Sequence, residues 1–178
     1  MTPIEARRRA RRAYELARLR DGVRAALPVI PLVAVSMLAC RRPEFTLPAG
    51  IGLFAVTTWL RARGEVYARA IVPGFLSGAA PLALPLVLRT SGHCCIGGVC
   101  WSGCMLACVA GGLLAGVGAG FFAAAEHRSR GPFLASVLLV AGLVGVLGCV
   151  MAGLAGVAGM AVALGTSATG YLVARPSH

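Results

Sequence analysis

An uncharged apolar stretch of 42 residues, from Phe133 to Ala174, places the strongest constraint on the fold of this chain. As a single α-helix this stretch would be roughly 63 Å long, about twice the thickness of the hydrocarbon core of a bilayer. A helix of that length cannot cross a membrane once and end at its far surface. We therefore expect two membrane-spanning helices that fold back on each other between Cys149 and Gly153.

The remainder of the chain has the same apolar character. Hydrophobic residues make up 58% of the 178 residues and charged residues only 13%, whereas soluble domains carry about 25% charged residues. Apolar stretches near the spanning length of about 20 residues follow one another along most of the chain. The sequence therefore predicts an all-α, polytopic membrane bundle of six transmembrane helices with short loops, preceded by an Arg-rich helical segment. The two parts are residues 1–24 and a transmembrane domain over 25–175, with spans at 25–40, 45–60, 70–88, 97–125, 133–149 and 153–174.

The positive charges predict which way this bundle faces. All seventeen basic residues are arginines that cluster between the apolar stretches, which is typical of topology signals rather than of nucleic-acid binding. With six spans, fourteen arginines fall on the side of both termini, and only Arg41, Arg42 and Arg89 fall on the other side. Since cytoplasmic loops carry the excess of arginine, we expect a multi-pass protein of a bacterial inner membrane. Its N- and C-termini should be cytoplasmic, and it should have no direct nucleic-acid partner.

A lipoprotein signal is the competing interpretation of the N-terminal region, because residues 36–40, SMLAC, resemble a cleavage site. The position three residues before Cys40 is Met37 rather than the usual leucine, and the basic region ahead of the apolar segment is long. We therefore expect Cys40 to remain an ordinary residue at the membrane interface.

No expected span holds a charged residue near its middle. Ion and proton pathways use ionisable residues at membrane depth, so we expect neither a proton-coupled carrier nor a conventional cation channel. Because no nucleophilic triad, phosphate-binding loop or dinucleotide fingerprint is present, we expect no enzymatic activity, and no cofactor other than a soft metal ion. Gly112, Gly116 and Gly120 in the fourth span are spaced for close helix packing, which we expect to take place within the chain.

Five of the seven cysteines lie near the start of the fourth span, on the non-cytoplasmic side. Thiols and an imidazole select soft metal ions such as Cu(I), and the candidate ligands are His93, Cys94, Cys95 and Cys100. That side of a bacterial inner membrane is oxidising, so a disulfide is the second interpretation, either between Cys100 and Cys104 or from this loop to Cys149. Packing of small, buried side chains is the third interpretation.

The positions of the cysteines along their helices predict which of them meet. Cys100, Cys104 and Cys108 are four residues apart and form one stripe on a helix. Cys149 lies at the expected turn between the last two spans, on the same side of the membrane as Cys100. We therefore expect Cys100 and Cys149 to lie close together, whereas Cys108, two helical turns deeper, should be a packing residue.

Residues 96–175 resemble the six-span bacterial anti-sigma factors of the NrsF type. The likeness consists of the pair Cys100 and Cys104 at the start of the fourth span, the Gly-rich fourth and fifth spans, and Cys149 at the outer end of the fifth. The resemblance implies that these three outer-face cysteines sense redox or metal stress. It also implies that residues 1–24 bind an extracytoplasmic-function sigma factor on the cytoplasmic side. The candidate contacts in that segment are Arg7, Arg8, Arg11 and Arg12.

Two alternative functions remain open from the sequence. The adjacent Cys94 and Cys95 are similar to the vicinal cysteines that small mercury-transport proteins carry at a membrane entrance. A soft-metal transporter of the mercury or copper type is therefore the first alternative. A structural or accessory membrane subunit, in which the cysteines only pack, is the second.

Overall fold

The computed structural model describes residues 3–40, 43–90, 100–126, 129–149 and 153–174, and within these ranges every regular element is an α-helix. This confirms the predicted all-helical class. In chain order the helices are α1 (Pro3–Ala26), α2 (Val29–Cys40), α3 (Pro43–Arg63), α4 (Glu65–Arg69), α5 (Ile71–Thr90), α6 (Cys100–Ala125), α7 (Arg130–Cys149) and α8 (Gly153–Ala174).

Five helical segments in the described part of the chain are long and apolar enough to cross a membrane, which supports a multi-pass membrane protein. They are Arg7–Leu38, Glu65–Leu88, Gly103–Ala125, Arg130–Cys149 and Gly153–Tyr171. The predicted span 45–60 does form a helix, α3, but this helix is not among the five. Its internal Pro48, its threonines and the charged residues at both of its ends lower its mean hydropathy. A count of six spans therefore stays a prediction.

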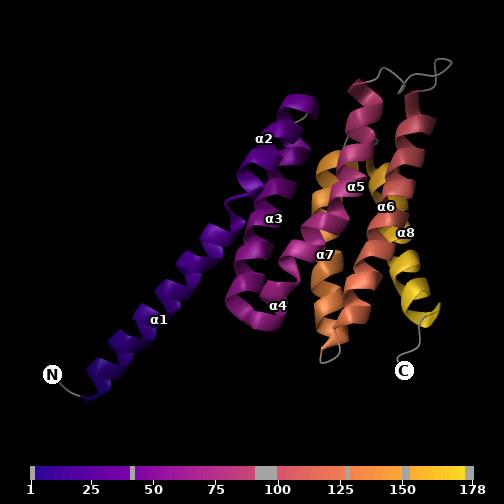
Figure 1. The fold of residues 1–178 in the computed structure, drawn as a ribbon. Coiled ribbons are helices and arrows are strands. Elements are labelled where there is room, and N and C mark those ends of the chain that lie inside the picture. Colours follow the sequence, from indigo (N-terminus) through magenta and orange to yellow (C-terminus); the bar gives the residue numbers. More distant parts are fainter. Residues whose placement is uncertain (1–2, 41–42, 91–99, 127–128, 150–152, 175–178) are drawn as a thin grey trace.

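The long apolar stretch forms two helices, as predicted, instead of one. α7 ends at Cys149, and α8 begins at Gly153 and packs against it. The φ of Gly153 is 73°, in the left-handed region that glycine adopts without the steric cost of a side chain. Figure 1 shows α7 and α8 running in opposite directions within the bundle.

The first predicted span is interrupted by a turn at Leu27 and Pro28, which separates α1 from α2. Pro28 has no amide hydrogen to continue the helix, and its ring disfavours a helical conformation of the residue before it. Figure 1 shows α1 extending away from the other helices at this break. Only its C-terminal part packs against α3, where a β-carbon added to Gly22 would lie 2.9 Å from the carbonyl oxygen of Thr58.

Glycine-lined contacts hold α6 against α8. A β-carbon on Gly112 would lie 2.5 Å from the carbonyl oxygen of Met160, and one on Gly120 would lie 2.9 Å from Cβ of Tyr171. Between them, Gly116 faces the Leu164 carbonyl so closely that a side chain would overlap it. In lipid, where water does not drive helices together, such close backbone approach supplies the packing energy. The structure thus places these glycines in contacts within the chain, as expected.

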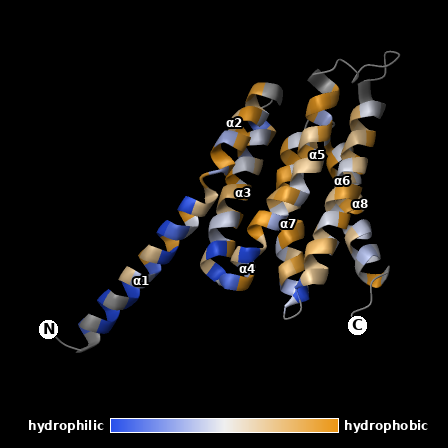
Figure 2. Ribbon diagram, in the orientation of Figure 1, coloured by the Kyte–Doolittle hydropathy of each residue, from blue (hydrophilic) through white to orange (hydrophobic). Residues whose placement is uncertain are grey.

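Most of the arginines in the helices after α2 lie at one end of the bundle. Figure 2 shows the hydrophilic residues concentrated along α1 and around α4, while the bundle helices are predominantly apolar. The last turn of α3, α4 and the start of α7 lie at this end, and they carry Arg61, Arg63, Arg69 and Arg130. The opposite end contains the C-terminal ends of α5 and α7 and the start of α6.

Candidate functional site

Part of the predicted site lies outside the described residues. This holds for His93, Cys94 and Cys95, so the loop metal site stays a prediction. Cys100 is the first residue of α6, but its side chain is not among those described. The proposed proximity of Cys100 and Cys149 therefore also stays a prediction.

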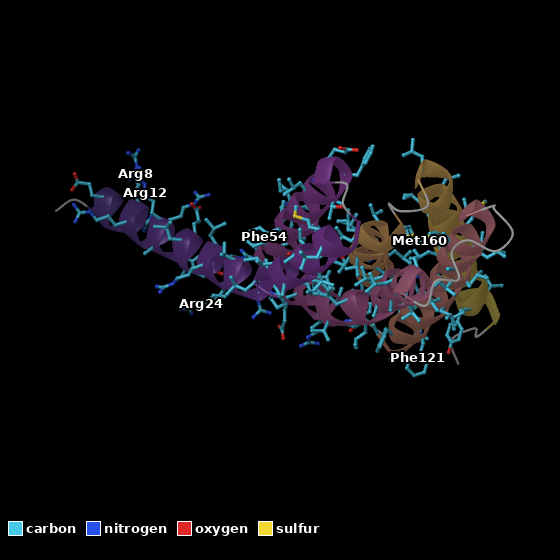
Figure 3. All side chains as sticks on the ribbon, turned by 90° about the horizontal axis from the view of Figure 1, so that it is seen from above. Arg8, Arg12, Arg24, Phe54, Phe121 and Met160 are labelled. Carbon is cyan, nitrogen blue, oxygen red and sulfur yellow. The ribbon has the colours of Figure 1, made fainter. Side chains whose placement is uncertain are left out.

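A cluster of buried sulfur atoms occupies the interior of the bundle. It consists of Cys104 and Cys108 from α6, Cys149 from α7 and Met160 from α8. Cys108 and Cys149 are completely buried, and Met160 is 1% exposed. In Figure 3 Met160 lies among the bundle helices. We call these four residues the sulfur cluster.

Cys149 of α7 contacts residues of three other helices, α5, α6 and α8. Its Sγ lies 3.7 Å from Sδ of Met160 and 3.7 Å from the carbonyl oxygen of Pro81 in α5. Its thiol is also hydrogen-bonded to that of Cys108. Since Cys149 has only one proton, it donates to only one of these three neighbours at a time.

The sequence of α5 explains why a carbonyl group is available at Pro81. Two prolines, Pro81 and Pro85, lie inside this helix. A carbonyl group in an α-helix normally accepts from the amide four residues later, but Pro85 has no amide hydrogen. Within a membrane no water is present to satisfy the oxygen that is left. The thiol of Cys149 supplies a weak donor at this point.

Three glycines allow the neighbouring helices to approach this part of α5. A β-carbon on Gly111 of α6 would lie 2.5 Å from Cα of Pro81, and one on Gly148 of α7 would lie 2.7 Å from the Pro81 carbonyl oxygen. A β-carbon on Gly145 would lie 3.0 Å from Cγ of Pro81 and would overlap Sδ of Met160. Pro81 is thus surrounded by backbone from two helices, next to the sulfur cluster.

Cys108 is a functional candidate that the sequence analysis assigned to packing alone. It is buried, as expected for a packing residue, but its thiol contacts Cys149. One signal in the sequence places Cys108 on a helix face used for close packing: the spacing of four residues that joins Cys104 to Cys108 continues through Gly112, Gly116 and Gly120. Because these glycines face α8, Cys108 at the same spacing points toward the same neighbour. No spacing in the sequence relates Met160 of α8 to these cysteines.

The described cysteines do not form a conventional metal site. Among the described residues, no group of three or more His, Cys, Asp or Glu side chains is arranged to hold a metal ion. Cys104, Cys108 and Cys149 are also not joined in disulfides in this structure. The cluster in its described state therefore contains reduced thiols and one thioether.

The candidate partner-binding residues lie on the exposed part of α1. Arg7, Arg8, Arg11 and Arg12 all belong to this helix and are exposed. Arg11 donates to Glu15 at 3.1 Å, yet the Arg11 side chain remains 82% exposed. In Figure 3 the labelled Arg8 and Arg12 lie on the part of α1 that is remote from the bundle. These arginines are thus accessible to a partner.

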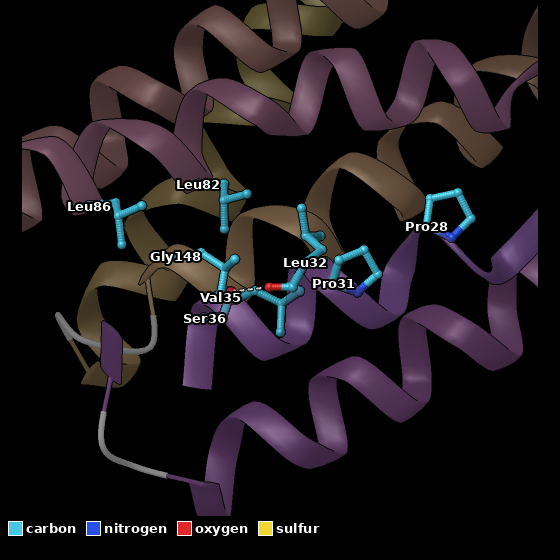
Figure 4. Close-up of a pocket in the computed structure, with 9 residues that line it drawn as sticks. Pro28, Pro31, Leu32, Val35, Ser36, Leu82, Leu86 and Gly148 are labelled. Carbon is cyan, nitrogen blue, oxygen red and sulfur yellow. Dashed lines mark hydrogen bonds between the residues drawn. The ribbon is translucent and has the colours of Figure 1, made fainter. Parts of the chain in front are cut away.

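An apolar cavity of about 300 Å³ lies on the flank of the bundle. Figure 4 shows its walls, which come from α2, α5 and α7. The lining residues are Pro28, Pro31, Leu32, Val35, Ser36, Leu82, Leu86, Leu147 and Gly148. The hydroxyl of Ser36 donates to the Leu32 carbonyl oxygen at 2.9 Å. Since no ionisable side chain lines this cavity, it offers no acid, base or ion ligand.

No family model, curated protein or solved structure matches the chain. The functional assignment therefore depends on the geometry of α1 and of the sulfur cluster.

Proposed function

We propose that this chain is a membrane-embedded regulator of the inner membrane. Its exposed helix α1 holds a cytoplasmic partner, and the cysteines of the bundle sense redox or metal stress. The partner class that agrees with the sequence resemblance is an extracytoplasmic-function sigma factor, with the chain acting as its anti-sigma factor. The observation that carries this proposal is that α1 extends away from the bundle formed by the other helices.

The surface of α1 favours binding to a protein. Besides its arginines, α1 carries exposed apolar side chains, including Tyr14, Leu16 and Leu19, which are 65%, 66% and 52% exposed. A helix with cationic and apolar groups around its circumference matches an acidic protein surface that also contains apolar pockets. A topology signal alone needs only the charge and has no use for these apolar groups.

The attachment of α1 provides a route from the bundle to the partner. Gly22 packs on Thr58 of α3, and Leu53 and Leu60 of the same helix belong to a core cluster with Val144 and Leu147 of α7. α7 ends at Cys149 in the sulfur cluster. A chemical change at the thiols thus acts on α7, which packs against α3, and α3 in turn contacts α1.

A transcriptional experiment tests the proposal in the cell that encodes the chain. Removing residues 3–21, while keeping Gly22 and all that follows, should raise transcription of the partner's regulon constitutively. Charge reversal of the four candidate contacts should have the same effect, through the variants Arg7→Glu, Arg8→Glu, Arg11→Glu and Arg12→Glu combined. The matched control is Arg61→Gln with Arg63→Gln, which removes positive charge at the same end of the bundle but leaves α1 intact.

The outcomes separate regulation from other uses of α1. If the transcriptome is unchanged by both α1 variants, the regulator proposal is wrong, and α1 serves as a topology anchor or as a contact with anionic lipid. If the control variant has the same effect as the α1 variants, the cause is altered membrane insertion rather than loss of a binding surface.

Soft-metal transport is the second candidate function, because the sulfur cluster contains the donor types that bind soft ions. A transporter requires ions to pass the cluster, whereas a sensor requires only that they bind. If the chain is a transporter, cells that express it should contain a different amount of the metal from cells that lack it. If the chain is a sensor, the two kinds of cell should contain equal amounts.

A further inference from the structure

We propose that Cys149 and Met160, supported by Cys108, form a binding site for a soft monovalent metal ion of the Cu(I) type inside the bundle. This site differs from the loop residues His93, Cys94, Cys95 and Cys100 named above. It depends on the proposed sensing function only for its biological consequence, because the binding itself needs no partner.

The spacing of the sulfur atoms fits a shared metal ion. Cys149 Sγ and Met160 Sδ are 3.7 Å apart. Two sulfur atoms bonded to one ion at about 2.3 Å lie roughly 3.8 to 4.0 Å apart in tetrahedral or trigonal geometry. Cys108 belongs to the same buried cluster and its thiol contacts Cys149, so it can supply a third sulfur donor. The two sulfur atoms therefore need almost no movement to bind an ion.

The chemical nature of the donors selects the type of ion. Thiolate and thioether sulfur are soft ligands that favour Cu(I) over hard ions such as Mg²⁺ or Ca²⁺. The described cluster contains no carboxylate or imidazole, and a hard ion would find only the Pro81 carbonyl oxygen nearby.

Electrical neutrality favours a monovalent ion. Burial of an uncompensated charge in an apolar interior is costly. When a Cu(I) ion binds, the S–H bond of Cys149 breaks, its proton leaves to water, and the sulfur forms a bond to the metal. One positive charge enters and one leaves, so the buried site remains neutral while Cys108 keeps its proton.

The position of the site suits a signal from outside the cell. Cys149 is the last residue of α7, at the end of the bundle opposite to the arginine-bearing end. Metal binding also removes the proton that Cys149 donates to Pro81. The ion therefore changes a contact between α7 and the proline-containing part of α5.

Silver binding to the purified full-length chain tests the site, because Ag(I) is a soft monovalent ion that does not change its redox state. The chain is prepared under reducing conditions with Cys40, Cys94, Cys95 and Cys100 replaced by Ala, which leaves Cys104, Cys108 and Cys149. We expect this chain to retain one Ag(I) per molecule after desalting. Cys149→Ala should abolish retention, and Met160→Leu should weaken the affinity at least tenfold.

A matched control and one further variant address the specificity of these effects. Met105→Leu changes a methionine of α6 that is 37% exposed and outside the cluster, and it should leave the affinity within about twofold. Cys108→Ala, which removes the supporting thiol, should weaken binding by an intermediate factor. Met→Leu substitutions conserve volume, and an unchanged thermal melting midpoint verifies that each variant is folded.

Three results would overturn the proposal. One is the absence of retained Ag(I) in the parent chain, and another is an equal loss of affinity in Met105→Leu and Met160→Leu. Tighter binding of Zn²⁺ than of Ag(I) would contradict the monovalent assignment. If the chain in which Cys40, Cys94, Cys95 and Cys100 are replaced by Ala does not fold, the test uses Cys149→Ala in the otherwise unaltered chain. That single change must then lower the retained silver by one ion per molecule. Because these measurements contain no partner, their failure leaves the α1 experiment unaffected.

Discussion

The thiol of Cys149 in α7 lies 3.7 Å from the carbonyl oxygen of Pro81 in α5. This oxygen lacks the usual helical donor because the residue four positions later is Pro85, which has no amide hydrogen. A proline pair that weakens one helix is thus compensated by a cysteine from another helix. The same cysteine also contacts Met160 and Cys108, so the state of one thiol affects the contacts among four helices.

The first prediction concerns this compensation. Cys149→Ala removes the donor and leaves a small void, and we expect it to lower the free energy of unfolding by about 1–2 kcal/mol. Pro85→Ala restores an amide hydrogen to the Pro81 carbonyl, so the same Cys149→Ala change should cost less in that background. Reversible unfolding in mixed micelles measures both values. An equal cost in the two backgrounds would show that the Cys149–Pro81 contact contributes nothing.

A second prediction compares two glycines that differ in their surroundings. A methyl group at Gly116 would overlap the Leu164 carbonyl and the Ser167 hydroxyl, whereas one at Gly142 would meet nothing within 4 Å. Gly116→Ala should therefore lower the free energy of unfolding by about 1–3 kcal/mol. Gly142→Ala should leave it unchanged or raise it by about 0.5–1 kcal/mol, because alanine restricts the unfolded chain. The same unfolding measurement tests both variants, and similar values would contradict the close α6–α8 contact.

The third prediction concerns orientation. Reporter fusions after Arg63 and after Arg130 should read cytoplasmic, and a fusion near Gly97 should read external, because arginine-rich loops are retained inside. As a control, replacement of the arginines in α4 and in the residues next to it should weaken the preference of this loop for the cytoplasmic side. External readings at both arginine-bearing sites would reverse the orientation and would place the sulfur cluster near the cytoplasm.

A fourth prediction distinguishes two sensing pairs by the response of the intact chain to oxidant or soft metal. The positions of the cysteines along the expected spans predict that Cys100 meets Cys149, whereas the structure brings Cys108 to Cys149. We expect Cys149→Ser to abolish the response and Cys108→Ala to weaken it, with Cys100→Ser retaining it. Reporter transcription after exposure measures this response. Loss in Cys100→Ser with a normal response in Cys108→Ala would favour the outer pair, and equal, mild effects at all three positions would mean that the cysteines only pack.

Several features follow from the sequence because they depend on local hydropathy and length. The helical class is one, since an apolar chain in lipid must satisfy its backbone hydrogen bonds within each segment. Another is the division of the stretch from Phe133 to Ala174 into two helices, because one helix of that length exceeds the bilayer. The contact face of Gly112, Gly116 and Gly120 was also predictable, because small residues every four positions allow close helix approach.

Other features required the tertiary structure. The turn that separates α1 from α2 lies within a stretch whose average composition is apolar, and α3 has a polarity close to the limit for a span. Window averages hide the effect of a single residue such as Pro28. The sequence also gave no means of deciding that α1 would extend away from the bundle.

The sulfur cluster shows most clearly what local patterns leave undecided. Pro81, Cys108, Cys149 and Met160 come from four different helices, and no spacing in the sequence relates them. Periodicity determines which side chains share a face of one helix, but the rotation and depth of each helix relative to its neighbours depend on packing of the whole bundle. The sequence therefore places several thiols near the start of the fourth span and one at the end of the fifth, and only the packing of α5 to α8 decided that Cys149 meets Cys108, Met160 and the Pro81 carbonyl.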